Sequence, residues 1–84
     1  MNTEQKPKCA VVGYGSWATA IVKTLTVNGH IVDWLVLNEE ILSSLKSRGR
    51  NSKYLPWCDI DTTHINPSND INAVVRDADI VFLA

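Results

Sequence analysis

Two glycines and a small residue near the start of the chain form a pattern that can bind phosphate. Gly13, Gly15 and Ala18 match G-x-G-x-x-[GA] within the segment CAVVGYGSWATAIV, residues 9–22. An apolar strand pattern leads into the glycines and a helical pattern follows them, which is the context in which this motif holds the diphosphate of a dinucleotide. Gly13 would permit a tight turn, Gly15 would let a phosphate reach the backbone, and Ala18 would keep the helix close to the sheet. The alternative is a plain strand-to-helix turn, which needs only one glycine.

Ser16 and Trp17 lie between Gly15 and Ala18. The Ser16 hydroxyl could donate a hydrogen bond to a phosphate oxygen, and the Trp17 ring could cover the diphosphate or the nicotinamide side. Alternatively, Ser16 caps the helix and Trp17 packs beneath the following loop. The residue types alone leave both interpretations open.

Asn38 follows Ala18 by 20 residues, the usual distance to the residue that meets the adenosine ribose. An acid there binds the ribose hydroxyls and an arginine accommodates a 2′-phosphate, but Leu37 and Asn38 offer neither charge. Asn38 can still bond a ribose hydroxyl, and Leu37 can lie against the adenine. Because Glu39 and Glu40 follow, we predict NAD as the cofactor, with NADP less favoured. Alternatively, Asn38 only caps the next helix.

Four cations lie within eight residues further along the chain: Lys46, Arg48, Arg50 and Lys53. Such a cluster after a helix is usually a solvated face that complements the helix C-terminus. The alternative is contact with a 2′-phosphate from outside the strand end, which keeps NADP open.

The remaining reactive side chains form no recognisable metal or catalytic set. Cys9 lies in a strand pattern and Cys58 in a loop, without Cys-x-x-Cys spacing, while His30 and His64 are isolated. We therefore predict no metal site and nominate no catalytic residue.

Composition and charge limit the classes of partner. A net charge of −1 gives no electrostatic reason to expect nucleic-acid binding. No apolar run approaches the roughly 20 residues that span a bilayer. The polar start lacks the apolar region of a secretory signal, so we expect a cytoplasmic protein.

The elements that position these residues alternate between strand and helix. Strands are expected at 8–12, 31–37 and 79–84, with a weak one near 63–66. The expected helices follow Gly15 with a stripe of Ala18, Ile21, Val22 and Leu25, run from Asn38 to Gly49, and begin at Ser68 or Asn69 with apolar positions from Ile71 to Ala78. This order predicts an α/β chain, a partial Rossmann fold whose parallel sheet has about four strands in the order 3-2-1-4 and helices on both faces. Residues 1–7 are expected to be a flexible arm.

Three segments, GYGSWATAIVKTLTVNGH, RNSKYLP and DADIVFLA, resemble the N-terminal dinucleotide-binding domain of NAD(P)-dependent glycerol-3-phosphate dehydrogenase. The resemblance runs from Lys8 onward and implies that residues 8–84 are an NAD-binding Rossmann domain. It implies that Gly13, Gly15, Ser16 and Trp17 bind the pyrophosphate. Many bacterial members carry arginine where this chain has Leu37, and NAD-preferring relatives carry an apolar or aromatic residue, which favours NAD.

The resemblance also implies a reaction: hydride transfer between dihydroxyacetone phosphate and sn-glycerol 3-phosphate, which supplies glycerophospholipid synthesis. Family members continue into a helical domain with the catalytic lysine, so we expect the 84 residues to be an incomplete dehydrogenase, inactive alone. The alternative is a stand-alone, non-catalytic dinucleotide-binding or dimerisation module. A related hydroxyacid or 6-phosphogluconate dehydrogenase is a weaker option, against which the Tyr54-Leu55-Pro56 loop argues.

The last apolar strand, residues 79–84, is expected to be an open sheet edge. Unpaired backbone groups on such an edge can pair with a second copy. We therefore expect a homo-oligomer formed through this strand.

Overall fold

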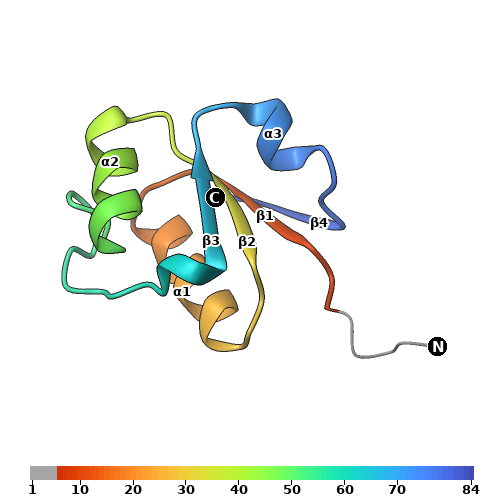
Figure 1. Ribbon diagram of the computed structural model, residues 1–84, viewed down its shortest axis with the longest axis horizontal. Helices are drawn as coiled ribbons and strands as arrows, with labels where there is room; N and C mark the ends of the chain where they lie inside the picture. Colours follow the sequence, from red (N-terminus) through yellow and green to blue (C-terminus); the bar gives the residue numbers. More distant parts are fainter. Residues whose placement is uncertain (1–5) are drawn as a thin grey trace.

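The computed structural model describes residues 6–84 and shows a parallel sheet with helices packed on its two faces (Figure 1). The four strands are β1 (Cys9–Val12), β2 (Val32–Leu35), β3 (Ile65–Ser68) and β4 (Ile80–Leu83). They lie in the order β3-β2-β1-β4, and every pairing is parallel. The α/β fold and the strand order 3-2-1-4 are therefore confirmed. Of the flexible arm expected at 1–7, residues 1–5 lie outside the described part of the chain.

Two helices, α1 (Ser16–Val27) and α2 (Glu39–Arg48), cover one face of the sheet (Figure 1). Alternate strand residues such as Val11 and Trp34 point to this face and are fully buried in the larger core cluster. Ile41 and Leu45 of α2 close the same cluster. Together they form the main core, which holds α1 against β1 and β2.

The short helix α3 (Ile71–Val75) covers the opposite face, where Val74 packs on Ala10 and Leu35. Because Ala10 and Leu35 alternate with the residues of the main core, each central strand buries both of its faces. The predicted arrangement of helices on both faces is confirmed.

The first two helices begin and end close to the predicted residues, but the buried face of α1 differs from the predicted one. The α2 helix begins at the Asn38 cap, whose Oδ1 accepts from the Ile41 amide at 3.0 Å, and ends at Gly49 with a φ of +69°. In α1, Ala18 and Val22 are buried as predicted, but Ile21 and Leu25 are only partly buried. The buried positions of α1 include two threonines instead, Thr19 and Thr26.

The last third of the chain departs from the prediction in three places. The third strand lies two residues later than expected, because a 3-10 turn, η1 (Thr62–His64), occupies the positions before it. Pro67 within β3 is tolerated because β3 is an edge strand. Asp70, rather than Ser68 or Asn69, caps α3, and the helix ends at Val75, before Ala78.

None of the helices within residues 6–84 is long and apolar enough to cross a membrane.

Candidate functional site

The glycine turn lies at the carboxyl end of the central strand β1, where its two glycines meet different demands. Gly13 has a φ of +129°, a conformation that L side chains rarely adopt, and a Cβ there would collide with the carbonyl oxygen of Ala84. Gly15 has an ordinary φ of −83°, and a Cβ there would meet nothing within 4 Å. The fold itself therefore needs Gly13, whereas the space beside the Gly15 backbone is open among the described residues.

The carbonyl oxygens of the glycine turn accept hydrogen bonds from other parts of the chain. The donors come from β2, from the loop after α2 and from α1 itself. They are Trp34 Nε1 to Gly13 O at 2.6 Å, Asn51 Nδ2 to Tyr14 O at 2.8 Å, and the Thr19 amide and hydroxyl to Gly15 O at 2.9 and 2.8 Å. The acceptors of three consecutive residues are thus engaged inside the fold, which fixes the turn before any ligand arrives.

The first amides of α1 follow Gly15 and have no capping side chain. Gly15 is the N-cap residue, no side-chain hydrogen bond caps the helix, and its first turn contains no acid. A helix leaves its first four amides unsatisfied and carries a partial positive charge at this end. A 12-residue helix whose N-terminus has no capping side chain and follows a glycine can bind a phosphate group through its free amides.

Ser16 and Trp17 are not used by the fold in the ways proposed as alternatives. Ser16 is the first helical residue rather than the cap, so the capping interpretation of Ser16 is wrong. The Trp17 side chain is 81% exposed, so it does not pack beneath a loop. Both side chains extend from the first turn of α1 and are free to contact a ligand.

Leu37 and Asn38 lie just beyond the carboxyl end of β2, the strand next to β1. The parallel register pairs Val12 with Leu35, so the glycine turn and the Leu37–Asn38 pair follow neighbouring strands at the same edge of the sheet. Leu37 is 58% exposed, so its side chain is accessible at this edge of the sheet. Asn38 caps α2 through Oδ1, and this leaves its Nδ2 group as a donor for a ribose hydroxyl.

Asn51 is a residue of the site that the glycine motif does not predict. Its side chain is fully buried and connects the turn to the loop after α2: Nδ2 donates to Tyr14 O and to Thr19 Oγ1, and Oδ1 accepts from the Lys53 and Tyr54 amides at 3.0 Å. A lone asparagine in a polar loop carries no periodic signal. Its presence in the RNSKYLP segment was the only indication.

The basic cluster does not act as one surface. Lys46 and Arg48 lie in the last turn of α2, and Arg50 pairs with Asp59 at 2.6 Å. Lys53 instead pairs with Glu40, in the first turn of α2, at 3.4 Å. Of the four cations, Lys53 is therefore the one that lies near the N-terminus of α2, where Asn38 is the cap.

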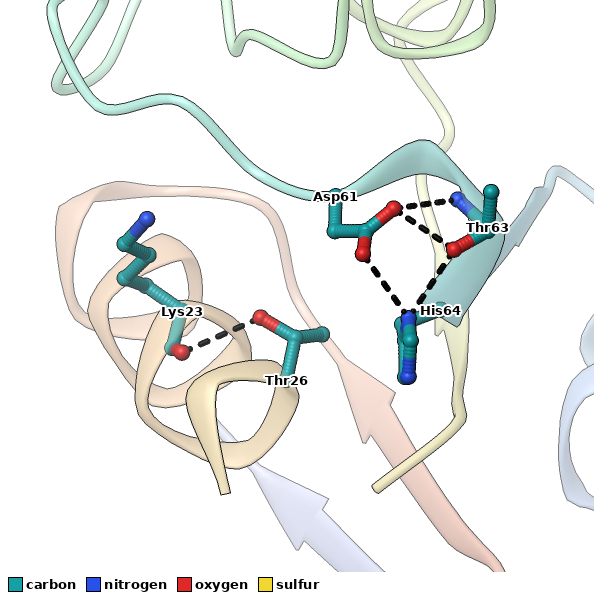
Figure 2. Close-up of polar contacts among 5 residues, drawn as sticks. All are labelled: Lys23, Thr26, Asp61, Thr63 and His64. Carbon is teal, nitrogen blue, oxygen red and sulfur yellow. Dashed lines mark hydrogen bonds and ion pairs between the residues drawn. The ribbon is translucent and has the colours of Figure 1, made fainter. Parts of the chain in front are cut away.

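A second polar cluster is formed by Asp61, the N-cap residue of η1, with Thr63 and His64 of η1 itself (Figure 2). Asp61 Oδ1 accepts from the Thr63 amide and hydroxyl, and these bonds, followed by the charge of His64, lower the pKa of Asp61. The Thr63 hydroxyl and the Asp61 carboxylate both meet Nδ1 of His64, at 3.0 and 3.1 Å. A triad needs its partners on opposite ring nitrogens, so this cluster is a turn cap.

The cysteines and histidines remain separate in space as they are in sequence. Within residues 6–84, no group of three or more His, Cys, Asp or Glu side chains is placed to hold a metal ion. Cys9 and Cys58 are both free thiols. Burial, with a smaller contribution from Asp79, raises the pKa of the Cys9 thiol, which keeps it protonated and unreactive.

Comparison with known proteins extends these observations. Residues 8–84 match the family model described as NAD-dependent glycerol-3-phosphate dehydrogenase N-terminus. Among curated relatives, glycerol-3-phosphate dehydrogenase [NAD(P)+] of Treponema denticola is 36% identical over 77 residues, 92% of this chain and 21% of the relative. The Moorella thermoacetica enzyme of the same name is 35% identical, over 94% of this chain and 23% of the relative. The chain thus spans about a fifth of the length of these relatives.

A crystal structure of glycerol-3-phosphate dehydrogenase from Coxiella burnetii shares the fold, with a TM-score of 0.82 over 93% of this chain and 24% of that one. At 23% identity this match supports the Rossmann-like architecture alone. The family match, which covers all the residues that build the glycine turn and the β2 end, carries the assignment. The chain therefore belongs to the family of NAD-dependent glycerol-3-phosphate dehydrogenase N-terminal regions.

Proposed function

We propose that residues 8–84 are the cofactor-binding portion of a glycerol-3-phosphate dehydrogenase and that they bind NAD at the glycine turn. The observation that carries this proposal is the open space beside Gly15, at the uncapped N-terminus of α1, into which a Cβ would project. The carbonyls of the turn are already bonded within the fold, so the free amides of α1 are the groups left to meet a diphosphate.

Each predicted contact residue has a role in this proposal. Gly13 and Gly15 form the cradle, the Ser16 hydroxyl donates to a phosphate oxygen, and the exposed Trp17 ring covers the diphosphate or the nicotinamide side. At the β2 end, Asn38 donates to a ribose hydroxyl and Leu37 lies against the adenine.

The proposed reaction is the reversible hydride transfer between dihydroxyacetone phosphate and sn-glycerol 3-phosphate. It is drawn from the names of the relatives, which are glycerol-3-phosphate dehydrogenases. The nicotinamide cofactor, when bound, accepts or supplies the hydride. We assign no catalytic residue within this chain and propose that these 84 residues are inactive alone.

We propose NAD rather than NADP as the preferred cofactor. Leu37 and Asn38 place no positive charge at the end of β2, and Glu39 and Glu40 follow directly. A 2′-phosphate at this point would meet two carboxylates, whereas the two ribose hydroxyls of NAD carry no charge to repel.

We further propose a homo-oligomer assembled through residues 79–84 and a cytoplasmic location. The β4 strand is a sheet edge, and its Ile80, Val81 and Leu83 side chains are 42%, 43% and 82% exposed. The free thiols of Cys9 and Cys58 accord with a reducing compartment.

Calorimetric titration of the chain with NADH at low salt tests the cofactor proposal. We expect saturable binding that is lost in Gly15→Val, because the valine side chain would occupy the open space beside the backbone that the phosphate needs. Thr24→Val, which places a valine at an exposed position of the same helix, is the control and should bind as the parent does. Absence of NADH binding in the parent, or unchanged binding in a folded Gly15→Val variant, would refute the proposal.

A further inference from the structure

Lys53 lies between the two halves of the proposed nucleotide site. Its backbone amide donates to Oδ1 of Asn51, and Nδ2 of the same asparagine donates to Tyr14 O in the glycine turn, at 3.0 and 2.8 Å. Its side chain reaches the other half, where Nζ lies 3.4 Å from Oε1 of Glu40 in the first turn of α2. One buried asparagine thus fixes the Lys53 backbone relative to the diphosphate end, while the ammonium lies at the ribose end.

The other cations of the segment are held elsewhere. Arg48 is eight residues beyond Glu40 on the same helix, which places its backbone about 12 Å further along the axis. Lys46 belongs to the same last turn of α2. Arg50 is engaged by Asp59 at 2.6 Å. Of the four cations between residues 46 and 53, Lys53 is the one whose charge reaches the start of α2.

This arrangement has a direct consequence for the 2′ position of the adenosine ribose. A phosphate at the 2′ position needs a cation near the end of β2, and an arginine commonly supplies it. Here the nearby cation is already paired with a carboxylate, so the pair offers little net charge to a phosphate. The side chains are 47% and 72% exposed, so the pair contributes little to stability and can be broken without unfolding the chain.

We propose that the Glu40–Lys53 ion pair determines the cofactor preference: Glu40 occupies the Lys53 ammonium and thereby withholds it from the 2′-phosphate of NADP. The inference rests on the proposed function, because it assumes that the adenosine ribose lies at the β2 end. It goes further by assigning specificity to a pair of residues outside the glycine motif and the strand end.

The test is the ratio of the dissociation constants for NADPH and NADH, measured by calorimetry on the chain and on Glu40→Gln. Loss of the carboxylate frees Lys53, so the ratio should fall by about fivefold, the size of one partly exposed charge contact. The NADH constant itself should change less than twofold. Glu39→Gln is the matched control: it removes the same charge from the same helix turn, and no ion pair joins Glu39 to Lys53 among the described residues.

A double variant separates the released lysine from a general change in charge. In Glu40→Gln/Lys53→Gln the ratio should return to the parent value or rise above it, because no cation remains to meet the phosphate. If Glu39→Gln and Glu40→Gln lower the ratio equally, or if Lys53→Gln has no effect in the Glu40→Gln background, the inference is wrong. Circular dichroism of each variant confirms that α2 is intact.

These outcomes are distinguishable from failure of the proposed function. If the parent binds neither NADH nor NADPH, the proposed function fails and the inference fails with it. If NADH binds and Gly15→Val abolishes that binding, yet Glu40→Gln leaves the ratio unchanged, the proposed function stands and the ion pair has no part in specificity.

Discussion

At the scale of single residues, the two motif glycines separate folding from binding. Gly13 has a positive φ and no room for a Cβ, whereas Gly15 has an ordinary φ and open space. The same substitution should therefore act differently at the two positions. We expect Gly13→Ser to destabilise the chain by about 2 kcal/mol, which lowers the melting temperature by roughly 10 °C in a domain of this size.

Gly15→Ser should change stability by only a few tenths of a kcal/mol, because serine is at least as good a helix N-cap as glycine. It should nevertheless weaken NADH binding, since its side chain would project into the open space beside the backbone where the phosphate is proposed to bind. Thermal melts of both variants check the first expectation, and titration of Gly15→Ser checks the second. Equal melting temperatures for the two serine variants would show that the positive φ of Gly13 and its contact with Ala84 do not restrict that position to glycine.

At the scale of the elements, the sequence predicts the helices and strands that have a periodic apolar pattern or a local cap. The helix from Asn38 to Gly49 has a capping side chain, two acids in its first turn and a left-handed glycine at its end, and the structure contains each of them. The third strand begins two residues later than predicted because η1 occupies the positions before it. The Asp61 side chain caps η1, and a single capping contact leaves no periodic pattern in the sequence. The role of Asn51 was not predicted for the same reason, since two of its four hydrogen bonds, to Tyr14 and Thr19, join segments that are distant in sequence.

The Asp61 cap makes the stability of η1 dependent on pH. Hydrogen bonds from Thr63, and then the charge of His64, lower the folded-state pKa of Asp61 below its unfolded value of about 3.9. The stabilisation is therefore present above that unfolded value and is lost as the pH falls through the folded pKa. We expect Asp61→Asn to be less stable than the parent at pH 7 and nearly equal to it at the acid end, measured by urea unfolding. An equal difference at both pH values would contradict this assignment.

At the scale of the whole molecule, the edge strand β4 is apolar and lies beside a hollow that it forms with α1. The β4 strand lies beyond β1 with its outer side unpaired among the described residues, and Val81 and Leu83 are exposed on it. A hollow of about 360 Å³ lies beside it, lined by Trp17, Ala20, Ile21, Thr24, Leu25 and Phe82. An edge with exposed apolar side chains and free backbone groups favours association with another strand.

We therefore expect the 84-residue chain to associate with itself at high concentration, by pairing β4 with β4 of a second copy. Val81→Lys should weaken this association, because a charged side chain on an edge strand opposes pairing of like strands, and two lysines would repel across the interface. Asn69→Lys adds the same charge at an exposed position away from β4 and is the control. Sedimentation equilibrium should give a mass that rises with concentration for the parent and the control but stays monomeric for Val81→Lys. A monomeric parent at high concentration would show that the β4 edge of this chain does not recruit a second copy.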